Sequence, residues 1–169
     1  MAKFEGNSSL DRSDIAILQA LQADSRRSIA ELGECAGLSS SACHRRIRAL
    51  EEQGFIAGYG ARLVPAKLGL QLHAFVEISL TSQSQESMDR FEAAVRRFDE
   101  ILECHLMSGT ADYQLRVAAA DLEDFDSIHR NCLARLPGAS SIRTSFSIRA
   151  IKSWAGYPVR SRGASQVSG

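Results

Sequence analysis

The stretch AGLSSSACHRRIRALE, residues 36–51, carries the pattern of the second half of a helix-turn-helix. Gly37 can end one helix in a left-handed conformation, and Ser39 can cap the next one with its hydroxyl. The apolar residues that follow recur at helical spacing and form one face, consisting of Cys43, Ile47 and Leu50. A short glycine-containing turn between two helices is typical of this motif.

The outer face of this helix is basic. Between Ser39 and Leu50 there are three arginines and one histidine but no acid. Serine hydroxyls allow close approach to a DNA groove, and arginine can bind guanine edges or phosphates. The plain alternative is a solvated arginine face on an ordinary helical bundle. The preceding capped helix and turn favour DNA binding over this alternative. We list as candidate DNA contacts Ser28, Ser39, Ser40, Ser41, His44, Arg45, Arg46 and Arg48.

Two more helices are predicted upstream. Asp11, with Asp14 three residues later, can cap a helix whose apolar face includes Ile15. Ser28 and Glu31 form an S-x-x-E capping box at the start of the next helix. Three helices within about 45 residues, the last two joined by a glycine turn, indicate a helix-turn-helix that could place Ser28 near a DNA phosphate.

The pattern changes after Pro65, where strand-like alternation takes turns with helical spacing. The expected order is strand 72–80, helix 88–98, strands 101–107 and 113–119, helix 122–136 and strand 142–148. This β-α-β-β-α-β order predicts a ferredoxin-like domain and an α+β protein.

The domain boundaries follow from these patterns. We expect a DNA-binding domain at 8–64, a linker at 65–70, an α/β domain at 71–155 and a Ser/Gly-rich disordered tail at 156–169.

Composition excludes few classes of function. The formal net charge is zero, and residues 1–60 carry seven basic against eight acidic side chains. Evidence for DNA binding therefore depends on where the basic side chains lie rather than on their number. No signal peptide or membrane span is evident, which favours the cytoplasm. The cysteines lack CxxC spacing and are interpreted as buried free thiols: Cys35, Cys43, Cys104 and Cys132.

The sequence resembles the Lrp/AsnC (leucine-responsive regulatory protein) family. The resemblance rests on residues 10–14, 36–51, 54–59 and 103–113, and covers about residues 10–152. It implies a winged helix-turn-helix followed by an effector domain of the RAM (regulation of amino acid metabolism) type. It also implies dimers formed through the sheets, often assembled into octamers, which bind double-stranded DNA and respond to an amino acid or related metabolite.

The resemblance also implies an effector site at the turn between the two central strands. Its residues would be Leu106, Ser108, Gly109, Thr110, Asp112 and Tyr113. Gly109 could expose backbone amides to a ligand carboxylate, and Asp112 could pair with an α-ammonium group. The plain alternative is that both residues only build a hairpin. No catalytic residue, metal or cofactor is expected.

Two departures from the family pattern concern this region. Ala111 stands where an aromatic residue is frequent, and residues 153–158 replace an ending that contains Thr-Thr. Two other functions remain open. One is a haem-pathway decarboxylase, for which the candidate residues are His73, His105, His129 and Cys132. The other is an amino-acid sensor that does not bind DNA.

Overall fold

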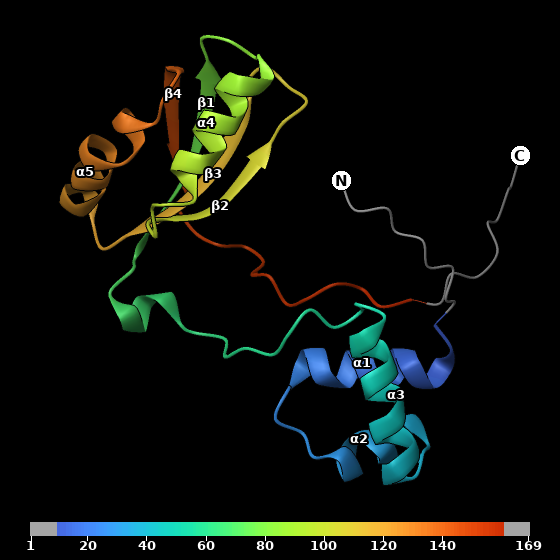
Figure 1. Ribbon diagram of the computed structural model, residues 1–169. Helices are drawn as coiled ribbons and strands as arrows, with labels where there is room; N and C mark the ends of the chain where they lie inside the picture. The colour runs from blue at the N-terminus through green and yellow to red at the C-terminus, as the bar shows by residue number, and fades with distance from the viewer. Residues whose placement is uncertain (1–9, 161–169) are drawn as a thin grey trace, which may run out of the picture. The chain divides into compact units, whose positions relative to one another are not determined.

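The computed structural model describes residues 10–160, which form two compact units (Figure 1). The helical unit comprises residues 10–62 together with 153–160, and the α/β unit comprises Leu63–Lys152. Each unit has its own hydrophobic core.

The helical unit contains three helices, as the sequence predicts. Their bounds are α1 Arg12–Ala23, α2 Ile29–Ala36 and α3 Ser40–Glu52. Asp11 and Ser28 start α1 and α2 with complete capping boxes, and Gly37 ends α2 with a φ of 66°. The core between the helices includes the predicted inner face of α3 and consists of Ile17, Ala20, Leu32, Cys43, Ile47 and Leu50.

The turn between α2 and α3 depends on a glycine that the sequence analysis did not single out. The Leu38 amide donates to the Gly33 carbonyl oxygen at 2.8 Å. A Cβ atom on Gly33 would lie 2.8 Å from the Leu38 carbonyl oxygen, which is closer than real Cβ contacts come. Gly33 therefore allows the two chain segments to approach closely enough to form the turn.

The wing expected after α3 differs from the prediction. Within the described residues no strand forms between Gln53 and Val64, and the segment runs without regular structure to a 3-10 turn, η1, at Pro65–Leu68. The wing therefore lacks the β-hairpin that would give this segment its own backbone hydrogen bonds.

The α/β unit has the predicted β-α-β-β-α-β order. Its elements are β1 Leu72–Leu80, α4 Gln85–Val95, β2 Ile101–Leu106, β3 Tyr113–Ala119, α5 Leu122–Asn131, the 3-10 turn η2 Leu133–Arg135 and β4 Ala139–Phe146. The sheet order is β2-β3-β1-β4 with every neighbouring pair antiparallel, the ferredoxin-like arrangement. β4 begins and ends earlier than predicted, and Ile148 is fully exposed.

Helices α4 and α5 cover the same face of the sheet (Figure 1). Phe91 of α4 and Phe125 of α5 belong to one core with Val76 and Leu115 from the central strands. The opposite face, which these helices leave uncovered, carries alternate residues such as Phe75 and Arg116. We refer to it as the open face.

Residues 153–160 belong to the helical unit rather than to the α/β unit or to a tail. Hydrogen bonds to α1 hold residues 157 and 159, which the sequence analysis assigned to the disordered tail. Residues 8–9 of the expected DNA-binding domain and 161–169 of the expected tail lie outside the described residues.

Candidate functional sites

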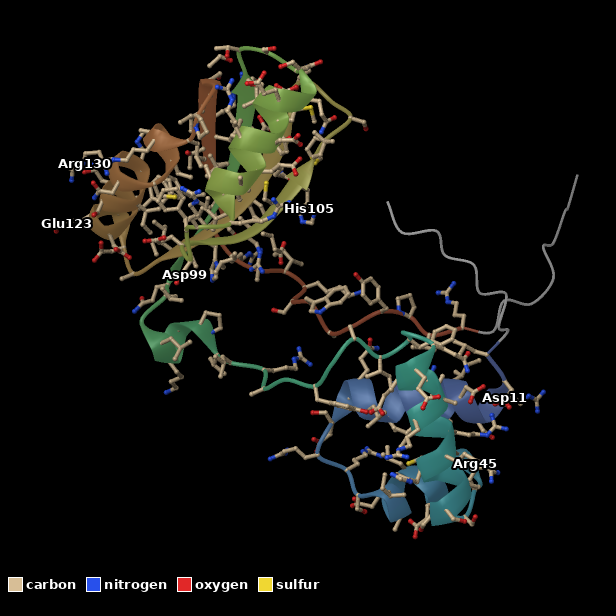
Figure 2. The ribbon with its side chains drawn as sticks, in the orientation of Figure 1. Asp11, Arg45, Asp99, His105, Glu123 and Arg130 are labelled. Atoms are coloured by element: carbon tan, nitrogen blue, oxygen red, sulfur yellow. The ribbon has the colours of Figure 1, made fainter. Side chains whose placement is uncertain are left out.

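The outer face of α3 presents the predicted basic and hydroxyl side chains to solvent. Ser39 is the N-cap of α3, and its side chain accepts a hydrogen bond from the Ala42 amide. Figure 2 shows Arg45 projecting from α3. The exposed residues on this face are Ser39, Ser40, Ser41, His44, Arg45 and Arg48. The arrangement suits a helix that reads a DNA groove, because its polar face is free while its apolar face is fixed in the core.

Arg46 differs from the other arginines on α3. One of its guanidinium nitrogens lies 2.6 Å from Asp11 and 2.8 Å from Asp14, both at the start of α1. These two aspartates also form the capping box of α1, so each carboxylate binds both a backbone amide and Arg46. The cap's backbone hydrogen bond, together with Arg46, lowers the pKa of Asp11. Arg46 thus ties α3 to α1, which differs from its predicted role as a DNA contact.

Ser28 is exposed, but its hydroxyl already forms hydrogen bonds to Glu31. Its hydroxyl donates to Glu31 at 2.8 Å and accepts from the Glu31 amide, which completes the box at the start of α2. Its position at a helix N-terminus is the one predicted.

A shallow groove of about 340 Å³ runs between α3 and the start of α2, and it includes a residue that the sequence analysis missed. Arg27 lines this groove together with His44 and Arg48. Tyr59 closes one side and donates a hydrogen bond to Glu51 at 2.7 Å. The sequence holds a signal for Arg27, because the basic pair Arg26-Arg27 directly precedes the Ser28 cap. Arg26 instead pairs with Asp24.

The turn between β2 and β3 brings the predicted effector residues to one end of the sheet. Asp112 is bound within the fold: its two carboxylate oxygens accept from the Leu80 amide and from the Gln83 side chain, each at 2.7 Å. The carboxylate therefore fastens the turn to the end of β1. An α-ammonium group would have to share these oxygens.

Gly109 has a φ that is not positive, so the turn does not require glycine at this position. A Cβ atom there would meet nothing within 4 Å. Ser108 and Thr110 on either side are exposed. The turn is thus open to solvent, with free space around Gly109.

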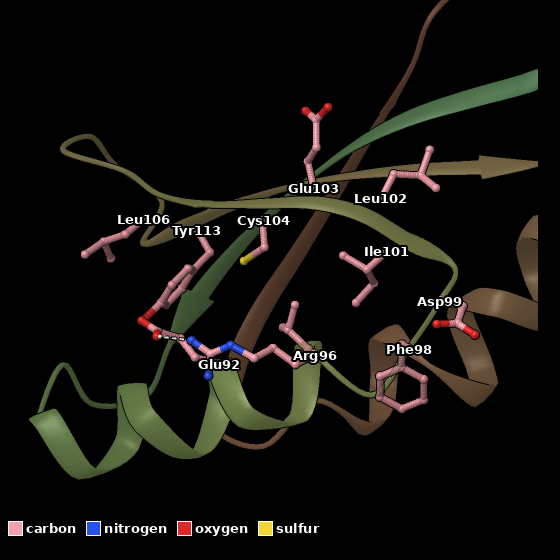
Figure 3. A pocket seen from close by; sticks show the side chains of 11 residues that line it. Glu92, Arg96, Phe98, Asp99, Ile101, Leu102, Glu103, Cys104, Leu106 and Tyr113 are labelled. Carbon is pink, nitrogen blue, oxygen red and sulfur yellow. Dashed lines mark hydrogen bonds and ion pairs between the residues drawn. The ribbon is translucent and has the colours of Figure 1, made fainter. Parts of the chain in front are cut away.

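Leu106 and Tyr113 share the wall of a cavity of about 620 Å³ between α4 and β2 (Figure 3). Tyr113 is 1% exposed, and its hydroxyl donates to Glu92 of α4 at 3.0 Å. Burial is the largest cause that raises the pKa of Tyr113, followed by this hydrogen bond. Leu106 is 59% exposed and could meet a ligand. The two residues at the ends of the turn therefore have different surroundings, one in the core and one at the surface.

The open face of the sheet carries charged pairs near the exposed aromatic side chain of Phe75. Arg116 pairs with Glu103 across β2 and β3, and Arg143 pairs with Glu77 across β1 and β4. Phe75 lies opposite Arg116 in the register and is 42% exposed. An exposed aromatic residue between charge pairs suits a protein interface.

The histidines named for a decarboxylase do not converge. His73 on β1 and His105 on β2 are separated by β3, and His129 lies on α5. Among residues 10–160, no three His, Cys, Asp or Glu side chains are grouped to hold a metal ion. No helix in the same range is long and apolar enough to cross a membrane.

The cysteines are all free thiols, but they are not all buried. Cys43 and Cys132 are buried and Cys104 is partly buried, whereas Cys35 is exposed. The prediction of burial was therefore wrong for Cys35, which lies on the outer side of the short helix α2.

Both halves of the chain match family models. The AsnC-type helix-turn-helix domain matches residues 10–51, and the Lrp/AsnC ligand binding domain matches residues 73–155. Over 143 residues the chain is 43% identical to the leucine-responsive regulatory protein of Salmonella typhimurium, covering 85% of this chain and 87% of the relative. The protein of the same name from Escherichia coli K12 is 42% identical over the same length and the same shares of both chains.

Solved structures agree with these matches. A transcriptional regulator from Neisseria meningitidis, in complex with L-methionine, superposes with a TM-score of 0.84 at 34% identity, covering 89% of this chain and 97% of that one. An AsnC family regulator from Agrobacterium tumefaciens superposes with a TM-score of 0.84 at 36% identity, covering 88% of this chain and 97% of that one. A feast or famine regulatory protein from M. tuberculosis, complexed with L-methionine, superposes with a TM-score of 0.77 at 30% identity, covering 86% of this chain and 96% of that one.

Proposed function

Because the chain belongs to the Lrp/AsnC family of transcriptional regulators, we propose that it reads double-stranded DNA through α3 and responds to an amino acid or related metabolite. The observation that carries the DNA assignment is the row of exposed polar side chains on α3, where Arg45 and Arg48 face solvent and no acidic residue stands between Ser39 and Leu50. We propose Ser28, Ser39, Ser40, Ser41 and His44 as further contacts, add Arg27, and assign Arg46 to the packing of α3.

Fluorescence anisotropy on a duplex selected by the wild-type chain from a random pool tests this assignment. Arg45→Ala and Arg48→Ala should each weaken binding by about 1–3 kcal/mol where they contact a base, or reduce the salt slope by about 1 where they contact a phosphate. Arg130→Ala, an exposed arginine on α5, is the matched control. Binding by both α3 variants equal to that of the control across the salt series would refute the assignment.

We propose that the effector is a free amino acid, since two structural relatives are complexes with L-methionine. The proposed site remains the end of the sheet, with Leu106, Ser108, Gly109, Thr110, Asp112 and Tyr113 as its residues. Exposed Leu106 supplies apolar surface for a ligand side chain. The open turn around Gly109 gives space for the ligand's polar groups.

Isothermal titration with a panel of L-amino acids, methionine and leucine first, tests the effector. Gly109→Leu fills the open turn without backbone strain and should weaken binding about tenfold or more by overlapping the ligand. Gly60→Leu is the control, because a side chain there also meets nothing within 4 Å. Unchanged affinity in Gly109→Leu would move the site away from this turn.

We further propose that the chain forms dimers through the open face and acts in the cytoplasm by binding rather than by catalysis. Phe75 at the centre of that face would be covered by the second copy. Phe75→Glu should therefore shift the chain toward monomer in light scattering, with Phe55→Glu in the helical unit as control. Dimer retention in Phe75→Glu would exclude this interface.

A further inference from the structure

Residues 153–160, which we name the strap, run along α1 in the helical unit and are held there by a glutamine. The Gln22 side-chain amide donates to the Tyr157 carbonyl oxygen at 2.8 Å, and its own oxygen accepts from the Tyr157 amide at 2.8 Å. One side chain thus satisfies both backbone groups of a single residue. Gln19, on the same face of α1, donates to the Val159 carbonyl oxygen at 3.2 Å.

The backbone of the strap is adapted to this contact. Gly156 has a φ of 112°, a conformation that side-chain-bearing residues rarely adopt. A Cβ atom at Gly156 would overlap the Gln22 side chain. Trp154 and Tyr157 pack edge to face on either side of this glycine, with ring centroids 4.6 Å apart. The sequence Trp-Ala-Gly-Tyr therefore fits Gln22 in both shape and hydrogen bonding.

A further hydrogen bond joins the two places where the chain crosses between units. The chain leaves the helical unit after Arg62 and returns at Ser153. The Arg62 guanidinium donates to the Trp154 carbonyl oxygen at 2.8 Å, so the outgoing and returning segments are tied together within the helical unit. With the strap in place, the helical unit is connected at two points of the chain instead of one.

We propose that Gln22 is a positioning residue for DNA recognition: by fixing the strap on α1 it gives the helical unit a second attachment and limits its rotation. This inference rests on the proposed DNA-binding function. A dimer presents two α3 helices to two half-sites, and the tolerated spacing depends on how freely each helical unit can turn. A helical unit attached at two points accepts a narrow range of spacings, and one attached at a single point accepts a wide range.

The contact itself is tested without DNA, in the full chain, by hydrogen exchange of the Tyr157 amide. Gln22→Ala removes both hydrogen bonds to Tyr157, each worth about 0.5–1.5 kcal/mol, so exchange should accelerate about tenfold. Trp154 is the one tryptophan of the sequence, and its fluorescence anisotropy should fall in the same variant. Gln53→Ala, at an exposed glutamine of the same unit, should match wild type in both measurements. Unchanged Tyr157 exchange in Gln22→Ala would overturn the proposal.

Gly156→Ala tests the same contact by changing the strap instead of Gln22. Its new methyl group overlaps Gln22, so it should release the strap as Gln22→Ala does. In the Gln22→Ala background the overlap is gone, and the added effect of Gly156→Ala on Tyr157 exchange should be smaller. Additive effects of the two changes would contradict a direct Gln22–strap contact.

The positioning role is tested on duplexes selected by wild type, with one to five base pairs inserted between the half-sites. Wild type and Gln53→Ala should lose affinity as the spacing changes, whereas the loss of affinity in Gln22→Ala should be about tenfold smaller. On a single half-site, Gln22→Ala should bind as tightly as wild type. An unchanged profile would overturn the positioning role, as would an equal loss on the single half-site. A wild-type chain that selects no duplex would refute DNA binding itself, while Tyr157 exchange still reports on the strap separately.

Discussion

At the scale of single residues, three arginines within four positions of α3 have different surroundings. Arg45 and Arg48 are exposed, whereas Arg46 is held by two carboxylates at the start of α1. Helical geometry turns successive side chains by about 100°, so neighbours in sequence face different partners. Charge counted along the sequence therefore overstates the positive charge that the helix offers to DNA.

Arg46→Ala should change stability but not the electrostatics of DNA binding. Loss of the partly exposed pairs with Asp11 and Asp14 should lower the free energy of unfolding by about 1 kcal/mol or less. The salt slope of DNA binding should stay at the wild-type value, while Arg45→Ala and Arg48→Ala serve as the comparison. A slope reduced by about 1 in Arg46→Ala would identify it as a phosphate contact after all.

The cysteines should react with thiol reagents at very different rates. Burial raises the pKa of Cys104 and of Cys132 to about 11, and it also raises the pKa of Cys43. These thiols stay protonated at pH 8, whereas Cys35 is exposed. A chromogenic disulfide assay on the native chain should count one fast thiol, which Cys35→Ser removes and Cys104→Ser does not. Two or more fast thiols would contradict the buried positions.

At the scale of elements, the α2–α3 turn should not tolerate a side chain at Gly33. Alanine gains up to about 1 kcal/mol of helix propensity, but its Cβ must push the Leu38 carbonyl aside, which costs about 1–3 kcal/mol. We expect Gly33→Ala to unfold at lower temperature in circular dichroism. Gly60→Ala, where the Cβ meets nothing within 4 Å, is the control and should stay near wild type. A more stable Gly33→Ala would show that the turn relaxes freely.

The start of α1 should make the helical unit sensitive to acid. The pKa of Asp11 is lowered below its ordinary value of 3.8, so its ionised form stabilises the fold above that pH and the contribution is lost as pH falls through the lowered pKa. Asp11→Asn keeps a capping oxygen but cannot titrate, and its melting temperature should fall less between pH 7 and pH 2. Asp99→Asn, an exposed carboxylate of the α/β unit, should follow wild type. Equal losses in all three would exclude Asp11 as a cause.

Elements with local signals could be predicted, and features set by distant contacts could not. The caps at Asp11, Ser28 and Ser39 act within three residues, so sequence was enough for them. Arg46 meets partners more than thirty positions away, and nothing near it in sequence indicates them. The strap is the extreme case, because Gln22 and Tyr157 are 135 positions apart and a Ser/Gly-rich composition nearby suggested disorder.

At the scale of the whole molecule, the two units have separate cores and should respond separately to core substitutions. Phe91→Ala opens a cavity under α4 and should destabilise the α/β unit by about 3–5 kcal/mol. Hydrogen-exchange mass spectrometry should then show faster exchange in β1, β3 and α4, with α1 to α3 near wild type. Ile17→Ala in the other core should give the reverse pattern. Acceleration of all elements by either variant would indicate a single cooperative unit.

The discontinuous make-up of the helical unit also sets an order of events during synthesis. Residues 10–62 leave the ribosome first, but the strap follows only after the whole α/β unit has been translated. Domains fold as they emerge, so α1 to α3 can form early while Gln22 still lacks its partner. The hydrogen bonds from Gln22 and Arg62 to the strap form last, after β4 is complete. Docking of the strap is therefore the final step in maturation of the DNA-reading unit, and a chain that stalls within the α/β unit would leave a helix-turn-helix without its second attachment.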